Sequence, residues 1–223
     1  MMQLLLPFLL LASSWNLPQE YRAYRTQQQA YTLYRSGNYS GAEQRCREAL
    51  SGKAGHTDRS GVAIRFNLAG ALAMQGKHLQ ARHIYRNLAM NPGDEKIRIA
   101  SWYNEGTSFA MEALATEKKV QKKALLEQAL GRYTTLLLKK PRDIDTRINY
   151  EIVLRMLEKL KNGSAKHRGK RNEQKNTGSS NEEMANTAKR ILQQAQMKEN
   201  QLMRQLPRAS SSGKTEKTNR KDW

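Results

Sequence analysis

Three stretches of the chain repeat one pattern of apolar and polar positions. Each begins a predicted helix and places Asn directly after an aromatic or aliphatic residue. The stretches are residues 65–69 (Arg-Phe-Asn-Leu-Ala), 102–106 (Trp-Tyr-Asn-Glu-Gly) and 147–151 (Arg-Ile-Asn-Tyr-Glu). Strands are not indicated, because no apolar run of period two is bounded by hairpin turn residues. The pattern therefore predicts an all-α chain in which one helical unit recurs.

Small residues, turn glycines and closing prolines recur along the chain at intervals that fit a 34-residue unit of two helices. The first copy has Ala30, Gly37, Tyr39, Ala42 and Ala49, the second has Ala69, Gly76, Ala81, Tyr85 and Pro92, and the third has Trp102, Tyr103, Gly106, Ala129, Tyr133 and Pro141. Small residues let the two helices approach closely, glycine ends the first helix in a left-handed conformation, and proline stops the second. This register resembles the tetratricopeptide repeat. An insertion of about ten residues, measured against the standard repeat, falls around Ala115–Lys123.

The repeats are expected to span residues 21–160 and to end in a capping helix. A solenoid needs such a cap because nothing else covers the apolar face of its last repeat. Asp145–Leu160 has apolar residues separated mostly by charged ones and matches only the first helix of a unit. It is predicted to be the cap.

The N-terminus differs from the repeats. Leu4–Ala12 is an apolar run followed by small residues, and it is shorter than the roughly 20 residues that span a bilayer. Residues 1–14 are interpreted as a secretory signal peptide, which predicts a periplasmic or cell-envelope protein. No Lys or Arg precedes the run, so an uncleaved membrane anchor remains an alternative. Cys46, the only cysteine, can form no intramolecular disulfide and is predicted to be a small buried residue in a helix.

The C-terminal third has a different composition. Residues 161–181 are polar and basic and are predicted to be a disordered linker, and residues 207–223 a disordered basic tail. Residues 182–206 predict a helix with one apolar stripe. Four residues of that stripe are predicted to dock: Ile191, Leu192, Leu202 and Leu206. The stripe has three candidate surfaces: its own solenoid, a partner protein or, with less support, a membrane surface.

The whole layout resembles a particular family of repeat proteins. Pro141–Glu151, Ala188–Ala195 and the terminal Lys221–Trp223, together with the apolar leader, are similar to the BatC-type tetratricopeptide proteins of the Bat aerotolerance operon. The resemblance implies a cell-envelope protein that acts beside MoxR-type ATPases and von Willebrand factor A-domain proteins, in aerotolerance or oxidative-stress survival.

No catalytic constellation is recognisable in the sequence. The four histidines lie at no metal-ligand spacing with one another or with the cysteine. Ser212–Thr215 echoes the end of a phosphate loop but lacks the glycine and the strand that such a loop needs. We therefore expect a non-enzymatic protein with no metal and no cofactor.

A groove formed by the first helices of the repeats is the better candidate site. Eight residues are predicted to face it: Tyr31, Tyr34, Phe66, Asn67, Tyr103, Asn104, Thr107 and Asn149. Asn side chains can hold a peptide backbone, and aromatic rings supply contact area. The alternative is that the asparagines serve contacts between helices. The net charge of +19, spread over repeats and tail, favours anionic partners. An anionic membrane or nucleic acid is therefore a further alternative partner. Nucleic acid is the less favoured of the two, because the chain is predicted to be exported.

Overall fold

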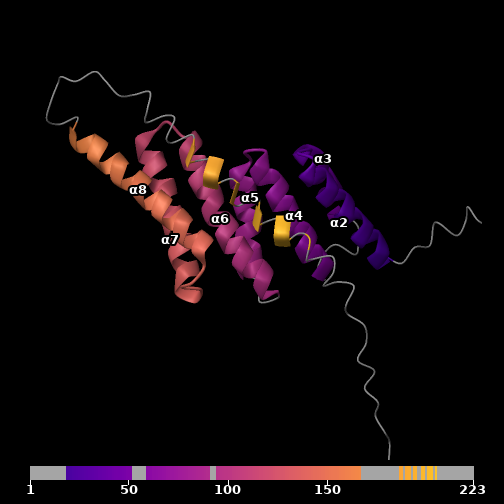
Figure 1. The fold of residues 1–223 in the computed structure, drawn as a ribbon. Coiled ribbons are helices and arrows are strands. Elements are labelled where there is room, and N and C mark those ends of the chain that lie inside the picture. Colours follow the sequence, from indigo (N-terminus) through magenta and orange to yellow (C-terminus); the bar gives the residue numbers. More distant parts are fainter. Residues whose placement is uncertain are drawn as a thin grey trace, which may run out of the picture.

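The computed structural model of the chain consists of helices packed against one another in sequence order (Figure 1). It describes residues 19–51, 59–90 and 94–166, and the positions 186–187, 189–191, 193–194, 197–198, 200–202 and 204. The main helices are α2 (Gln19–Arg35), α3 (Tyr39–Ser51), α4 (Arg59–Met74), α5 (His78–Met90), α6 (Glu95–Ala115), α7 (Lys119–Lys139) and α8 (Ile144–Lys166). No strand occurs in these described ranges, and each helix packs on the next. The predicted all-α class is therefore confirmed.

Two tight glycine turns join the first two helix pairs. Gly37 ends α2 with φ 80° and Gly76 ends α4 with φ 75°. Residues other than glycine rarely adopt this backbone conformation. At each turn the following residue donates a backbone hydrogen bond across the glycine: Asn38 to Leu33 at 2.9 Å and Lys77 to Leu72 at 3.0 Å. The glycine positions in the sequence thus predicted both turns.

The helices of the third pair, where the sequence predicted an insertion, are longer than those of the first two pairs. α6 and α7 each have 21 residues, whereas α2 to α5 have between 13 and 17. Only Thr116–Lys118 separates α6 from α7, so the extra residues form helical turns rather than a loop. Asp94 caps the start of α6 through hydrogen bonds from the backbone N–H groups of Lys96 and Ile97.

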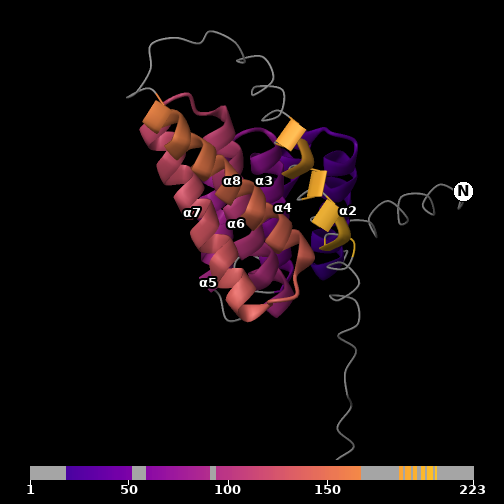
Figure 2. The same ribbon diagram turned by 60° about the vertical axis from the view of Figure 1, so that its left-hand side comes forward.

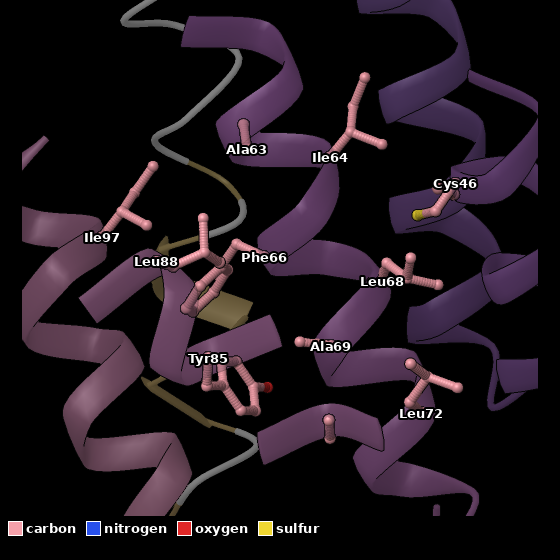
Figure 3. Close-up of a cluster of buried hydrophobic side chains, with 12 residues drawn as sticks. Cys46, Ala63, Ile64, Phe66, Leu68, Ala69, Leu72, Tyr85, Leu88 and Ile97 are labelled. Carbon is pink, nitrogen blue, oxygen red and sulfur yellow. The ribbon is translucent and has the colours of Figure 1, made fainter. Parts of the chain in front are cut away.

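One hydrophobic core cluster joins α3, α4, α5 and the start of α6 (Figure 3). Phe66 and Tyr85 meet edge to face with ring centroids 5.7 Å apart, while Leu68 and Leu72 point toward α3. Cys46 on α3 is buried in this cluster, and burial raises the pKa of its thiol to about 12. Its predicted role as a small buried residue is confirmed.

The third helix pair contains a second cluster built around two tyrosines. Tyr103 on α6 and Tyr133 on α7 are both fully buried, with ring centroids 6.1 Å apart. The rings approach because Gly106 has no side chain. A Cβ atom at this position would lie 2.8 Å from Cε1 of Tyr133 and 3.2 Å from Cβ of Arg132. Here the small residue of the repeat is required by close helix packing.

A buried carboxylate joins three consecutive helices. Glu105 on α6 is only 1 % exposed, and its carboxylate oxygens lie 3.0 Å from Nε of Arg86 on α5 and 2.7 Å from Nε of Arg132 on α7. Both arginines are partly exposed, so each guanidinium keeps some of its hydration while it neutralises the buried charge. This pairing fixes α6 between its two neighbours.

A second carboxylate joins α3 to the turn after α4. Glu43 forms ion pairs with Lys77 and Arg47 at 2.8 Å and accepts a hydrogen bond from Gln75 at 2.9 Å. Burial alone would raise the pKa of this carboxyl, but the hydrogen bonds lower it to about 2. Glu43 is therefore ionised at neutral pH.

The last solenoid helix, α8, packs on α7 and reaches α6. Val153 and Leu157 are its buried apolar residues, whereas Ile148, Ile152 and Leu154 are half-buried. Residues 1–14, 167–185 and 207–223 lie outside the described residues, and with them the predicted signal peptide, most of the predicted linker and the tail. Among the described helices, none is long and apolar enough to cross a membrane.

Candidate functional site

A helical segment from the C-terminal part of the chain lies across the solenoid. Every described position between 186 and 204 is helical. Figure 2 shows this segment against the bundle, beside α2, α4 and α8. Of the surfaces considered for the apolar stripe, the chain's own solenoid is the one that it contacts. We call residues 186–204 the C-terminal segment.

The C-terminal segment covers a cavity of about 230 Å³. The cavity walls come from α4, α6, α7 and the turn before α8, and the segment supplies the remainder. The lining residues are Phe66, Lys96, Ile99, Ala100, Tyr103, Asn104, Leu136, Lys140, Asp143, Lys198, Gln201 and Leu202. We use the name groove for the solenoid surface formed by these walls together with Tyr31 and Asp145, which also contact the segment.

Lys198 of the segment has three partners on the solenoid. Its Nζ lies 2.9 Å from Oδ1 of Asp143 and 3.2 Å from Oδ2 of Asp145, two carboxylates at the start of α8. The same ammonium group lies 4.2 Å from the centroid of the Tyr103 ring. Two carboxylates and an aromatic face together form a site for one cation. We call these three residues the cation subsite.

The position of Asp143 at the helix start is part of the same subsite. Its Oδ1 accepts a hydrogen bond of 2.9 Å from the backbone N–H of Thr146. Partial burial would raise the pKa of Asp143, but the hydrogen bonds from Lys198 and Thr146 outweigh it and hold this pKa below its ordinary value. The carboxylate is therefore ionised at neutral pH and available to a cation.

Two further contacts place the segment along the groove. Leu202 packs against the core cluster that includes Phe66, one helical turn beyond Lys198. Nε of Arg204 donates a hydrogen bond of 2.8 Å to the hydroxyl of Tyr31 on α2. Ile191 is fully buried, while Leu192 and Leu206 lie outside the described residues. The segment thus contacts the solenoid from α8 to α2.

Four of the eight residues predicted for the groove belong to it. Phe66, Tyr103 and Asn104 line the cavity, and Tyr31 contacts Arg204. These residues come from α2, α4 and α6, the first helices of the three pairs. The repeat register had placed the predicted groove on these first helices.

The other four predicted residues lie in the packing between helices. Asn149 donates a hydrogen bond of 2.8 Å to the Tyr103 hydroxyl, and Thr107 lies 3.2 Å from the Tyr133 hydroxyl. Tyr34 is buried, and its ring meets that of Tyr39 edge to face. Asn67 is also buried, and its side chain has no hydrogen-bond partner among the described residues.

Two of the three asparagines, Asn104 and Asn149, serve contacts between helices. Besides lining the cavity, Asn104 donates a hydrogen bond of 3.3 Å to the hydroxyl of Tyr85 on the preceding helix. Asn149 does the same for Tyr103 on α6. In both cases an amide satisfies a tyrosine hydroxyl inside the protein, which is the alternative that the sequence had left open.

The cation subsite was not foreseen from the sequence in this role. Asp143 and Asp145 stand at the start of α8, and Lys198 stands four residues before Leu202 of the predicted stripe. The ion pairs join residues 53 and 55 positions apart, a distance that no local periodicity reports. Acidic residues at the start of a helix are already explained by their interaction with the helix dipole, so in the sequence they did not indicate a cation site.

No further chemistry is evident in the described part of the chain, where no group of three or more His, Cys, Asp or Glu side chains is placed to hold a metal ion. No protein-family model matches the sequence, and neither curated protein sequences nor solved structures contain a significant match. The groove, with the helical segment that lies in it, is therefore the candidate site on structural grounds alone.

Proposed function

We propose that the chain is a tetratricopeptide-repeat scaffold that binds a helix of a partner protein in the groove and has no catalytic role. The repeat assignment is supported by the glycine turns at Gly37 and Gly76 and by the buried Ala81 and Tyr85 of the second unit. In the third unit, Gly106 provides the close approach that small repeat residues permit.

One observation supports partner binding more than any other: a helix already occupies the groove. The cation subsite holds an ammonium group, and the adjoining apolar surface holds a leucine. A surface with separate sites for a charge and for an apolar side chain is suited to an amphipathic helix. The resemblance to BatC-type proteins makes MoxR-type ATPases and von Willebrand factor A-domain proteins of the cell envelope the first partners to look for.

Site-specific photocrosslinking in cells tests the proposal. A photoreactive amino acid replaces Lys96, in the wall of the groove, or Leu79, which is exposed on α5 and does not line the cavity. We expect a discrete protein adduct from position 96 and none from position 79, with the partner identified by mass spectrometry. Adducts that are equally frequent from both positions, or absent from position 96, would reject the groove as the binding surface.

A further inference from the structure

Several contacts that hold the C-terminal segment in the groove lie close to the solvent, although Ile191 is fully buried. Lys198 and Leu202 are only partly buried, and Arg204 is exposed although it contacts Tyr31. Exposed polar contacts of this kind contribute little to affinity because water competes for both partners. A partner helix with more extensive buried contacts would therefore bind the groove more tightly than this segment does.

The fit between the segment and the groove is incomplete. The cavity of about 230 Å³ remains between them, and Phe66, Ile99, Leu136 and Leu202 are among the residues that line it. A void beside an apolar side chain forfeits contacts that a larger side chain would make. A helix with a bulkier apolar residue at the position of Leu202 would therefore pack better than the segment itself.

The charges of the groove further restrict its partner. Asp143 and Asp145 pair with a single ammonium group, yet Lys96 and Lys140 line the same cavity. A uniformly basic helix would be repelled by these lysines. One well-placed cation, four residues before a large apolar residue on the same helix face, satisfies both conditions.

The segment also stays near the groove through the chain itself. Nineteen residues, 167–185, connect the end of α8 to the first described position of the segment. Tethering makes binding intramolecular, so weak contacts suffice to keep a groove occupied. A partner in free solution must compete with that local concentration.

We infer that the C-terminal segment is an internal competitor for the groove, and that the partner is a helix carrying Lys or Arg followed four positions later by a large apolar residue. The inference rests on the proposed function, because it assumes that the groove takes a partner. The segment mimics this helix with Lys198 and Leu202. Partner binding then requires displacement of the segment, which becomes free for contacts of its own.

Binding of a synthetic peptide to the full-length chain tests the competition. The probe is a fluorescein-labelled peptide with the sequence of residues 184–206, followed by fluorescence anisotropy. The release variant combines Lys198→Glu with Leu202→Asp. Its matched control combines Gln193→Asp with Met197→Glu, at two exposed positions of the same segment. Circular dichroism verifies that both variants keep the helical fold.

We expect the release variant to bind the peptide more tightly than the wild type. If the segment occupies the groove in about nine of ten molecules, its release strengthens apparent binding about tenfold. The control variant should bind like the wild type. Equal affinity of the release variant and the wild type would overturn the inference.

A second probe tests the kind of partner. In the release variant, a peptide with Leu202→Phe should bind about threefold to fivefold more tightly than the natural peptide, because it fills part of the apolar cavity. A peptide with Lys198→Gln should bind more weakly, and adding Asp143→Asn to the protein should reduce binding of the natural peptide to a similar extent. If these three changes have no effect, the assigned cation and apolar subsites are wrong.

The failure of this inference can be distinguished from the failure of the proposed function. If photocrosslinking from position 96 captures the same amount of partner in the wild type and in the release variant, the groove binds a partner and the internal competition is rejected. If the release variant binds the peptide but captures no cellular protein, the competition stands and the proposed function fails. A release variant that dimerises, as measured by light scattering, would make a second copy of the chain the occupant and would overturn the assignment to a different partner.

Discussion

Replacing Gly106 by alanine places a methyl group against the ring of a buried tyrosine. The new Cβ atom would lie 2.8 Å from Cε1 of Tyr133, closer than carbon atoms pack, and 3.2 Å from Cβ of Arg132. Tyr133 has little room to move, since it is fully buried and its hydroxyl lies 3.2 Å from Oγ1 of Thr107. The substitution therefore requires α6 and α7 to separate or the ring to leave its position.

Two opposing terms set the magnitude. Alanine is favoured over glycine inside a helix by about 1 kcal/mol. Overpacking of a filled core costs about 1–3 kcal/mol. We therefore expect Gly106→Ala to lower the free energy of unfolding by about 1 kcal/mol, since the packing term exceeds the helix term.

Gly131 on α7 supplies a matched control. It is an exposed glycine inside a helix, and a Cβ atom there would meet no atom within 4 Å. Gly131→Ala changes only the helix term, so it should raise the free energy of unfolding by about 0.5–1 kcal/mol. Urea unfolding followed by circular dichroism at 222 nm measures both variants against the wild type.

The two variants should shift the urea midpoint in opposite directions. If Gly106→Ala stabilised the protein as much as Gly131→Ala, the close approach of α6 and α7 would not exist in solution. The interpretation of Gly106 as a packing requirement would then be wrong. A lower midpoint for both variants would instead show that the helix term was misjudged.

Three further predictions concern buried charged and thiol groups. Glu105→Gln removes the charge shared by Arg86 and Arg132 and should lower the free energy of unfolding, measured in urea, by about 2 kcal/mol. The loss is smaller than for a fully buried ion pair because both arginines are partly exposed. An unchanged urea midpoint would contradict a stabilising role for Glu105. The pKa of Glu43 is lowered to about 2 from 4.5 in the folded state, so its contribution to stability is fully present above pH 4.5 and is lost as the pH falls toward 2. The urea midpoint of the wild type should accordingly fall more steeply between these pH values than that of Glu43→Gln, and parallel curves would exclude the pairing. Cys46 should not react with a thiol reagent such as dithionitrobenzoate until urea unfolds the chain, and fast native-state reaction would contradict its burial.

The helical framework was largely predictable because its signals are local. Gly37 and Gly76 mark turns through a backbone conformation that few other residues adopt, and Ala81 and Tyr85 occupy the buried positions that the repeat register assigns. The insertion near Ala115 was found in the sequence, but its form was not. Whether extra residues form a loop or lengthen two helices depends on what the added turns pack against. Here the longer helices α6 and α7 pack against each other.

The candidate site was predicted only in part, because burial is not a local property. Phe66 and Tyr103 line the cavity as expected, but Asn149 and Thr107 are used by tyrosine hydroxyls of neighbouring helices. A position in the register fixes the direction in which a side chain leaves the helix. It does not fix what the next helix places there.

By itself, the sequence determined the helices, the two glycine turns and the apolar stripe of the C-terminal segment, because each depends on residues a few positions apart. Only the tertiary structure decided that this segment lies in the groove, with Lys198 on Asp143 and Asp145 and Arg204 on Tyr31. The stripe alone left several docking surfaces open. The choice among them came from charges and a cavity that α2, α4, α6, α7 and α8 create together, and no stretch of the sequence contains that information.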